Sequence, residues 1–229
     1  MKKPTALLTG ASSGIGLATA RALVADGYSV QGIARDFSST EFDDLVKTEL
    51  DLSQIDQLAN SLQSFKSAPE VLVLNAGYGQ FGGIEQFSHH QIRRLVDTNL
   101  VSNLFLIKHF LPKMKLQGCG DIVLLGSESA LQGAKAGAIY CATKFAIRGL
   151  AQSLRADCAT AGIRVMLVNP GPVASDFFDD LDFAPQLGEQ FEIPPESVAD
   201  AIMSALKQPR SVVVDEINLQ PIKRSFRKT

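Results

Sequence analysis

The sequence predicts an α/β protein built on a doubly wound parallel sheet of about seven strands, with helices on both faces. Two observations predict it. Short apolar runs alternate along the chain with longer segments of helical period, and glycines or hydrogen-bonding residues follow several of these runs. The 229 residues can bury one sizeable core, and no repeat or linker divides them. We therefore expect a single domain over residues 1–229.

Seven short apolar runs are the expected strands, because their length and β-branched content suit a buried parallel sheet. With the strand order 3-2-1-4-5-6-7, the turns after the first and fourth strands flank a crevice at the carboxyl ends, where open α/β sheets bind ligands. The runs cover residues 5–9, 28–34, 48–50, 71–75, 121–126, 163–169 and 211–217.

Five segments of helical period lie between these runs. Gly27 and Gly162 follow the first and the fourth of them, as glycine follows many helices. Ser88 and Gln91 form a capping box that begins the third. The segments cover residues 15–26, 55–65, 88–115, 140–160 and 195–206.

The composition is that of an ordinary globular protein, with 45% hydrophobic and 20% charged residues and a net charge of −2. No global basic excess points to nucleic acid, and no stretch approaches the roughly 20 apolar residues that span a bilayer. Cys119, Cys141 and Cys158 form no CxxC pair and leave one unpaired under any disulfide scheme, which favours a reducing compartment. We expect a cytoplasmic protein with no membrane or nucleic-acid partner.

Two further groups of residues are expected to be solvated. His89 and His90 begin a helix with no cysteine or acid at ligand spacing, so no metal site is expected. The basic stretch KRSFRK at residues 223–228 is expected to be a frayed chain end.

A glycine-rich turn, TGASSGIG at residues 9–16, joins the first strand to the first helix. Glycine lets backbone amides approach a phosphate closely, and the helix N-terminus adds a partial positive charge. The spacing Gly10-x3-Gly14-x-Gly16 is neither GxGxxG nor a P-loop. A tight strand-to-helix connection favours glycine without any ligand, so it is the place of the turn near the N-terminus that favours a dinucleotide site.

The end of the second strand bears on the cofactor. An acid there would hold the adenosine ribose hydroxyls of NAD, whereas an arginine would meet the extra phosphate of NADP. Both types are present, as Arg35 and Asp36. With the strand end placed at Ala34, Arg35 is well positioned and Asp36 is one step too far, so we expect NADP(H) rather than NAD(H).

Polar groups follow three later strands at their carboxyl ends, which parallel strands bring to one edge. They are Asn75-Ala76-Gly77, then Ser127 and Ser129, then Asn169-Pro170-Gly171. Together with the glycine-rich turn after the first strand, four strand ends carry glycines or hydrogen-bonding side chains. The preference of turns for such residues does not readily explain all four, so a catalytic site is favoured at this edge.

Tyr140 and Lys144 in YCATK lie four residues apart in a predicted helix, so their side chains should be neighbours. A free tyrosine has a pKa near 10, and a nearby ammonium together with a cationic nicotinamide would bring it closer to neutral. The structural alternatives are a buried tyrosine with a satisfied hydroxyl, a surface lysine, and an ordinary turn residue at Ser127.

With these motifs the chain resembles the short-chain dehydrogenase/reductase superfamily over nearly its whole length. The matching motifs are TGASSGIG (9–16), Asp51-Leu52, LNAG (74–77), Asn99, Ser127, YCATK (140–144) and NPGPV (169–173). The resemblance implies a Rossmann-type sheet, a nicotinamide cofactor and a catalytic tetrad of Asn99, Ser127, Tyr140 and Lys144. The expected cofactor-binding residues are Gly10, Ser12, Ser13, Gly14, Ile15, Gly16, Arg35, Asp51, Leu52, Asn75, Ala76, Gly77, Tyr140, Lys144, Pro170, Gly171 and Val173.

In the roles that we assign, Tyr140 is the general acid in reduction and the general base in oxidation. Lys144 lowers the pKa of the phenol and, by resemblance, binds the nicotinamide ribose. Ser127 holds the substrate oxygen. By resemblance Asn99 stabilises a local helix kink and a water of a proton relay.

Residues 174–193 occupy the position of the family's substrate lid and carry the aromatic residues Phe177, Phe178 and Phe183. Either the segment is a surface excursion that packs on the core, or it is an apolar cover over the substrate. We expect a small carbonyl compound or alcohol of modest polarity, with the acids of the segment facing water. The chain lacks the family's terminal VDGG segment, so a homodimer is expected, with a homotetramer as the alternative.

These observations favour an oxidoreductase that transfers a hydride between NADP(H) and a carbonyl or secondary alcohol. The alternative is a regulatory protein that binds NADP(H) on the same fold without turnover. The tetrad discriminates between them, since a sensor need not keep Ser127, Tyr140 and Lys144 together.

Overall fold

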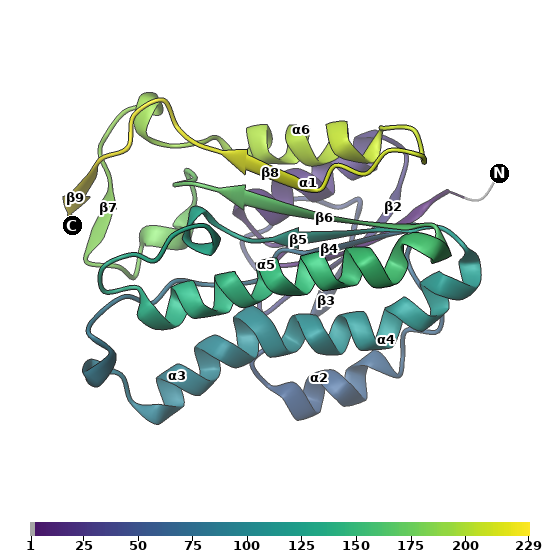
Figure 1. The fold of residues 1–229 in the computed structure, drawn as a ribbon, viewed down its shortest axis with the longest axis horizontal. Coiled ribbons are helices and arrows are strands. Elements are labelled where there is room, and N and C mark those ends of the chain that lie inside the picture. The colour runs from purple at the N-terminus through teal and green to yellow at the C-terminus, as the bar shows by residue number, and fades with distance from the viewer. Residues whose placement is uncertain (1–2) are drawn as a thin grey trace.

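The computed structural model describes residues 3–229; Met1 and Lys2 lie outside the described residues. Seven parallel strands form one sheet in the order β3-β2-β1-β4-β5-β6-β8. This confirms the predicted doubly wound sheet. The seventh strand is β8 because a short strand, β7, precedes it in the chain. Figure 1 shows the strands β6 and β8 running toward the side of the molecule where β7 and β9 lie.

Five of the seven strands match the apolar runs closely, β3 begins three residues earlier than predicted, and β8 begins five residues later. Each strand pairs in parallel with its neighbours, so all carboxyl ends reach one edge. The strands are β1 (Thr5–Thr9), β2 (Ser29–Ala34), β3 (Leu45–Glu49), β4 (Val71–Leu74), β5 (Gly120–Leu125), β6 (Ile163–Pro170) and β8 (Glu216–Leu219).

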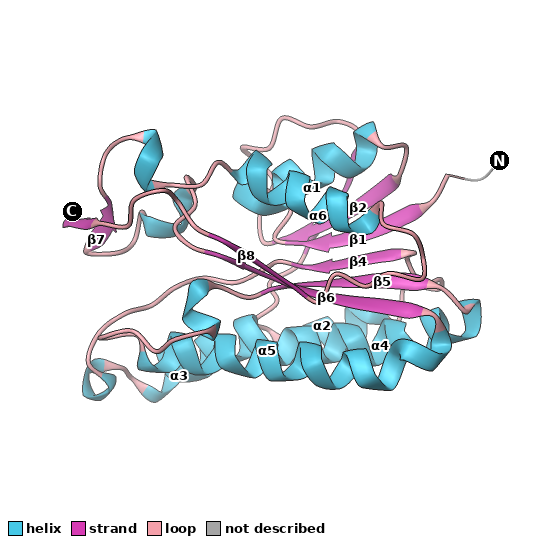
Figure 2. Ribbon diagram, turned by 45° about the horizontal axis from the view of Figure 1, so that its top comes forward, coloured by secondary structure: helices cyan, strands magenta, loops and turns pink. Residues whose placement is uncertain are grey.

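Helices cover both faces of the sheet, as Figure 2 shows: α1 and α6 on one face, and α2, α4 and α5 on the other. Side chains alternate between the faces along each strand, so Leu8 packs in the cluster under α1 and α6 while Leu7 packs under the other layer. The helices are α1 (Gly14–Ala25), α2 (Ile55–Leu62), α3 (His89–Val96), α4 (Ser102–Gln117), α5 (Ala138–Cys158) and α6 (Pro195–Leu206). Among residues 3–229, no helix combines the length and the apolar character needed to cross a membrane.

The predicted long helix over residues 88–115 is interrupted. A π-helical turn at Asp97–Val101 separates α3 from α4, and Asn99 is buried within it. Such a turn inserts an extra residue into the helical ladder and occurs often at functional sites. The family resemblance implied a local kink at Asn99, and asparagine is also a weak helix former.

The prediction that residues 223–228 form a frayed end is wrong. Strand β9 (Phe226–Lys228) pairs in antiparallel fashion with β7 (Phe183–Pro185), which lies within the segment 174–193. Backbone hydrogen bonds extend this pairing, since the Gln186 amide donates to the Ser225 carbonyl at 3.0 Å. A three-residue strand has no period to detect, and its partner lies some forty positions earlier in the chain.

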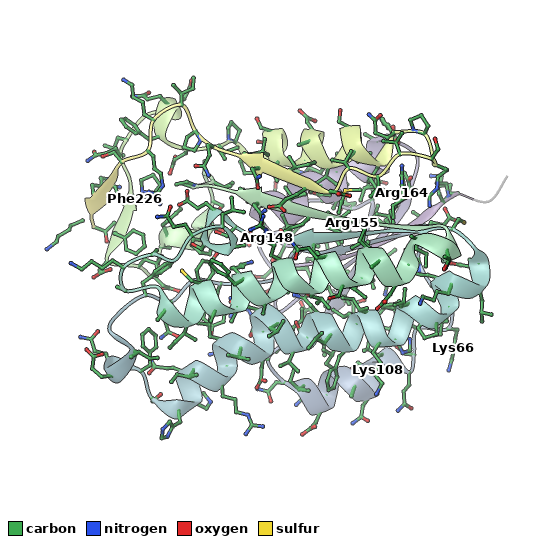
Figure 3. The ribbon with its side chains drawn as sticks, in the orientation of Figure 1. Lys66, Lys108, Arg148, Arg155, Arg164 and Phe226 are labelled. Atoms are coloured by element: carbon green, nitrogen blue, oxygen red, sulfur yellow. The ribbon has the colours of Figure 1, made fainter. Side chains whose placement is uncertain are left out.

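The run SVVVDEI also differs from its prediction as a strand at 211–217, because only residues from Glu216 onward pair with β6. The earlier residues form an irregular connection that is held by a buried arginine. Arg164 in β6 donates to the carbonyls of Leu206 at 2.8 Å and Gln208 at 2.9 Å. Its Nε lies 2.6 Å from Asp121 Oδ1, and Arg210 bonds the other carboxylate oxygen at 2.8 Å. Figure 3 labels Arg164 at this end of the sheet.

Asp121→Asn should lower the free energy of unfolding by about 2–4 kcal/mol, because it leaves the buried Arg164 without its anion. Urea unfolding measures this loss. The control is Asp26→Asn, which breaks an exposed pair with Lys207 and should cost at most about 1 kcal/mol. Equal losses in the two variants would show that the Asp121 network contributes no more than a surface pair.

Candidate active site

A cleft of about 1410 Å³ opens at the carboxyl edge of the sheet. Loops that follow β1, β2, β4, β5 and β6 form its walls, together with the segment 174–193 and the chain end. Most of the residues expected to bind the cofactor line it. They are Gly10, Ser12, Ser13, Gly14, Ile15, Arg35, Leu52, Asn75, Ala76, Gly77, Tyr140, Lys144, Pro170, Gly171 and Val173.

The glycine-rich turn has the shape of a phosphate cradle. Gly10 and Gly14 have φ values of 66° and 50°, in the left-handed region that favours glycine. A Cβ on Gly10 would lie 2.8 Å from the side-chain nitrogen of Asn75, which donates to the Thr9 and Gly10 carbonyls at 3.1 Å. Ser13 makes no side-chain cap hydrogen bond, so the first amides of α1 face the cleft without that partner. These residues fit a pyrophosphate group.

Two of the expected cofactor residues, Gly16 and Asp51, do not line the cleft. A Cβ on Gly16 would collide with the Gly10 carbonyl and the Asn75 side chain, so Gly16 allows α1 to pack closely against the turn. Asp51 accepts hydrogen bonds from the amide and the hydroxyl of Ser53 at 2.9 and 2.8 Å. It also lies 3.9 Å from Arg94, a cleft residue that sequence reasoning missed.

Arg35 and Asp36 differ in the hydrogen bonds that their side chains make. Both are exposed and both line the cleft directly after β2, which ends at Ala34 as predicted. The Asp36 carboxylate accepts from the Ser38 amide at 2.7 Å and from its hydroxyl at 2.9 Å. These hydrogen bonds from Ser38 hold the pKa of Asp36 below its usual value. The carboxylate is therefore engaged in its own turn.

Asn99 connects the π-helical turn to the loop after β4. Its Oδ1 accepts from the Tyr78 amide at 3.1 Å, and its Nδ2 donates to the Tyr78 carbonyl at 3.0 Å. A Cβ on Gly77 would lie 3.1 Å from Asn99 Oδ1 and 3.7 Å from Lys144 Nζ, so only glycine leaves this junction open. Asn99 does not itself line the cleft.

Ser127, Tyr140 and Lys144 meet where α5 covers the end of β5. The Ser127 side chain lies beside the Tyr140 phenol. The Ser127 oxygen also accepts from the Ser129 amide at 3.1 Å, and Asn169 Oδ1 accepts from the Ser127 amide at 3.3 Å. Lys144 Nζ donates to the Leu125 carbonyl at 3.0 Å and lies 5.8 Å from the centre of the Tyr140 ring.

Burial dominates the charge state of this pair. It raises the pKa of Tyr140 to about 12, while the neighbouring Ser127 side chain acts in the opposite direction. It lowers the pKa of Lys144 to about 8. The expected lowering of the phenol pKa by the ammonium together with a cationic nicotinamide stays a prediction for the cofactor-bound protein. At pH 7 the phenol keeps its proton, which suits a general acid in reduction.

Several residues around Tyr140 were not predicted as part of the site, although Phe177 was expected in a possible cover over the substrate. Phe81 from the loop after β4 and Phe177 from the segment 174–193 pack on the Tyr140 ring, with centroids 5.2 and 5.9 Å away. Arg224 and Phe226 from the chain end also line the cleft. Each belongs to a loop or a short strand without a detectable period. Among residues 3–229, no group of three His, Cys, Asp or Glu side chains is placed to hold a metal ion.

Comparison with known proteins identifies relatives over almost the whole chain. The family model described as short chain dehydrogenase matches residues 4–184. An uncharacterized oxidoreductase of Staphylococcus epidermidis is 30% identical over 97% of this chain and 99% of its own length. Human retinol dehydrogenase 8 is 34% identical over 76% of this chain and 60% of its own length. The crystal structure of an alcohol dehydrogenase from Thermococcus sibiricus with 5-hydroxy-NADP superposes with a TM-score of 0.85, at 26% identity, over 98% of this chain and 99% of that one.

Lys144→Met should raise the free energy of unfolding at pH 7 by about 1–3 kcal/mol, because it removes a buried cation. In the unfolded chain a lysine keeps its proton up to about pH 10, whereas the folded-state pKa is about 8. The wild type therefore gains stability as the pH rises from about 8 to about 10, and the difference between the two proteins should narrow over that range.

Thermal and urea unfolding at pH 7 and pH 9.5 measure this difference. Lys108→Met, at an exposed lysine of α4 labelled in Figure 3, is the control and should shift stability by no more than about 0.5 kcal/mol. A destabilised Lys144→Met protein at pH 7 would contradict the assigned burial cost.

Proposed function

The chain belongs to the short chain dehydrogenase family, and from that premise we propose that it is an NADP(H)-dependent oxidoreductase that interconverts a carbonyl compound and an alcohol. One observation carries the proposal. Ser127, Tyr140 and Lys144 converge at the cleft, beside a glycine turn shaped for a pyrophosphate, and Asn99 braces the same loop. A structural role for each residue alone does not explain their convergence.

In this proposal Tyr140 donates its proton to the carbonyl oxygen during reduction and takes it back during oxidation. When bound, the reduced nicotinamide cofactor supplies the hydride that the carbonyl carbon receives. Ser127 holds the developing alkoxide by a hydrogen bond from its hydroxyl, positioned by Ser129 and Asn169. Lys144 is anchored at the Leu125 carbonyl, from which its remaining N–H groups can meet a ribose hydroxyl and the proton path to Tyr140.

NADP(H) is favoured over NAD(H) by the residues at the end of β2. The Arg35 guanidinium is exposed in the cleft, whereas the Asp36 carboxylate is bonded to Ser38. A guanidinium at this position suits a ribose phosphate, which it can bind with two parallel hydrogen bonds. The related alcohol dehydrogenase was solved with 5-hydroxy-NADP.

A catalytic role is favoured over the alternative of a non-catalytic sensor. A sensor would need only the glycine turn that holds the dinucleotide. Burying a lysine beside a buried phenol costs folding free energy, and a protein that only binds the cofactor would not need this pair. The relatives are named as oxidoreductases or dehydrogenases. No observation on the described chain favours the sensor.

The substrate is proposed to be a neutral carbonyl compound or alcohol under a cover formed by residues 174–193. Phe177, Phe178 and Phe183 of this segment line the cleft, which makes its inner side apolar. A likeness to retinol dehydrogenase 8 supports a substrate of low polarity.

A homodimer is proposed through the face of α4 and α5. Each helix carries a large apolar side chain that is exposed in the single chain: Leu104 at 41% on α4 and Phe145 at 44% on α5. These helices lie side by side on one face of the sheet (Figure 2), where a second copy would cover both.

Tyr140→Phe should lower kcat for carbonyl reduction by at least about a hundredfold, because the ring stays and only the proton donor is lost. The affinity for NADPH should change little. A panel of aldehydes and ketones, followed by NADPH absorbance, gives kcat, and NADPH fluorescence titration gives the affinity. Equal turnover by wild type and variant would remove Tyr140 from the mechanism. Tight NADPH binding by a wild type that turns over no carbonyl compound would favour the sensor.

Arg35→Leu should lower kcat/KM with NADPH by about ten- to a hundredfold and leave the value with NADH nearly unchanged, because a charge-assisted contact to the extra phosphate is lost. Asp36→Asn is the matched control at the neighbouring position. It should leave the NADPH preference intact, since Asp36 is bonded to Ser38. The contrary result would be a wild type that prefers NADH and an Asp36→Asn variant that loses this preference. It would show that Asp36 binds the ribose hydroxyls.

A further inference from the structure

Five aromatic rings form a closed circuit next to the Ser127–Tyr140 contact. From Tyr140 the circuit passes through Phe81, Phe183, Phe178 and Phe177 and returns to Tyr140. Neighbouring centroids lie between 5.1 and 6.0 Å apart. All five residues line the cleft. We call these five rings the aromatic enclosure.

Two segments far apart in the sequence build the enclosure. Phe81 belongs to the loop after β4, and the other three phenylalanines belong to the segment 174–193. Tyr140 is only 5% exposed behind them. The proposed proton donor is therefore a buried member of the enclosure.

The chain end supports the outer side of the enclosure. Phe226 in β9 packs on Phe183 at 5.6 Å and on Phe178 at 6.4 Å between centroids. The Thr229 hydroxyl donates to the Leu181 carbonyl at 2.8 Å, so the last residue also holds this segment. Figure 3 labels Phe226 beside β7, at the end of the molecule where the strands finish. These residues lie beyond the part of the chain that matches the family model, which ends at residue 184.

An ion pair anchors the chain end next to the candidate catalytic serine. Arg224 donates to both carboxylate oxygens of Glu128, at 2.8 Å through Nη2 and 3.0 Å through Nε. Glu128 directly follows Ser127 in the chain. A paired guanidinium and carboxylate in this geometry fix orientation as well as position. The pair therefore sets where Phe226, two residues beyond Arg224, can lie.

We infer, resting on the proposed function, that the aromatic enclosure selects carbonyl compounds that carry a neutral aromatic ring on the carbonyl carbon. Aromatic rings prefer tilted or edge-to-face contacts with centroids roughly 4.5–7 Å apart, and the rings of the enclosure line the cleft, where they can offer such contacts to a substrate ring. Phe178 and Phe183 are then specificity-determining residues that contact the substrate ring. Arg224 and Phe226 are positioning residues that act through them.

Charge around the enclosure restricts the substrate further. Asp176, Asp180 and Asp182 are exposed and also line the cleft. The Arg224 guanidinium is paired with Glu128, so it does not offset them. An anionic group would lose its hydration among apolar rings and meet these acids. The enclosure should therefore discriminate against a carboxylate on the aromatic ring.

The test compares Phe183→Leu and Phe178→Leu with wild type on benzaldehyde, cyclohexanecarbaldehyde, 4-carboxybenzaldehyde and propanal. Each variant should lower the kcat/KM ratio of benzaldehyde to propanal by about tenfold, mainly through KM, because leucine keeps apolar contact but loses ring-to-ring contact. The ratio of cyclohexanecarbaldehyde to propanal should change by less than about twofold. Comparing ratios between proteins cancels the intrinsic reactivity of each aldehyde. Wild type should also reduce 4-carboxybenzaldehyde at least about tenfold less efficiently than benzaldehyde.

Phe191→Leu is the matched control, since Phe191 belongs to the same segment but does not line the cleft. It should leave all the ratios unchanged. Equal losses on benzaldehyde and propanal, or the same loss of the benzaldehyde ratio in Phe191→Leu, would overturn the inference. NADPH fluorescence titration checks that each variant is folded and binds cofactor.

A second arm tests the positioning role of the chain end. Arg224→Ala should raise the KM for benzaldehyde severalfold while kcat is kept, and Arg224→Lys should recover part of the loss. Arg227→Ala is the matched control, because Arg227 lies three residues further on in β9, is exposed and does not line the cleft. An Arg224→Ala protein with unchanged KM, or an Arg227→Ala protein with an equal rise, would contradict that role.

Different results would overturn the aromatic selectivity and the proposed function. A wild type that reduces propanal and benzaldehyde with no ring-dependent effect of the variants would overturn the aromatic selectivity and leave the proposed function standing. A wild type that binds NADPH and reduces none of the four aldehydes would overturn the proposed function itself.

Discussion

The candidate active site depends on holding a lysine ammonium out of water beneath a buried phenol. Lys144 and Tyr140 are 6% and 5% exposed. Removing a cation from water costs several kcal/mol unless acceptors replace its hydration. The chain supplies such an acceptor in the Leu125 carbonyl, at the last residue of β5. Helix α5 must therefore cross the end of β5 at this point, and the pocket is built around that crossing.

The same amide side chains that shape the cleft also join its loops together. Asn75 bonds the Thr9 and Gly10 carbonyls and so couples the end of β4 to the glycine turn after β1. Asn169 accepts from the Ser127 amide and donates to the Glu216 and Asn218 side chains, which couples β5, β6 and β8. In a parallel sheet these ends are neighbours although the chain separates them widely. The site is consequently rigid on its sheet side and closed by segments on its other side.

Periodicity and motif spacing were most successful where packing is regular. Helix α6 spans Pro195–Leu206, as its apolar period predicts, and β1 spans Thr5–Thr9. The interruption at Asn99 was expected from the family resemblance, and a poor helix former at this position agrees with it. The run SVVV, in contrast, has the composition of a strand but makes an irregular connection, because Arg164 takes the Val212 carbonyl and pairing begins only at Glu216. Local composition does not predict which backbone carbonyls will accept hydrogen bonds from a side chain that is distant in the sequence.

By itself the sequence determined the doubly wound sheet, the glycine turn, and the spacing that brings Ser127, Tyr140 and Lys144 to one edge, since each is written in local period and chain order. Only the tertiary structure decided that the chain end pairs with β7, that Arg224 meets Glu128, and that Phe81 and Phe177 pack on the Tyr140 ring. It also decided that burial raises the pKa of the phenol. These cases share one physical reason. Which short, aperiodic segments touch one another, and how strongly a titratable group is shielded from water, depend on residues that are distant in the chain. No local sequence pattern encodes either property.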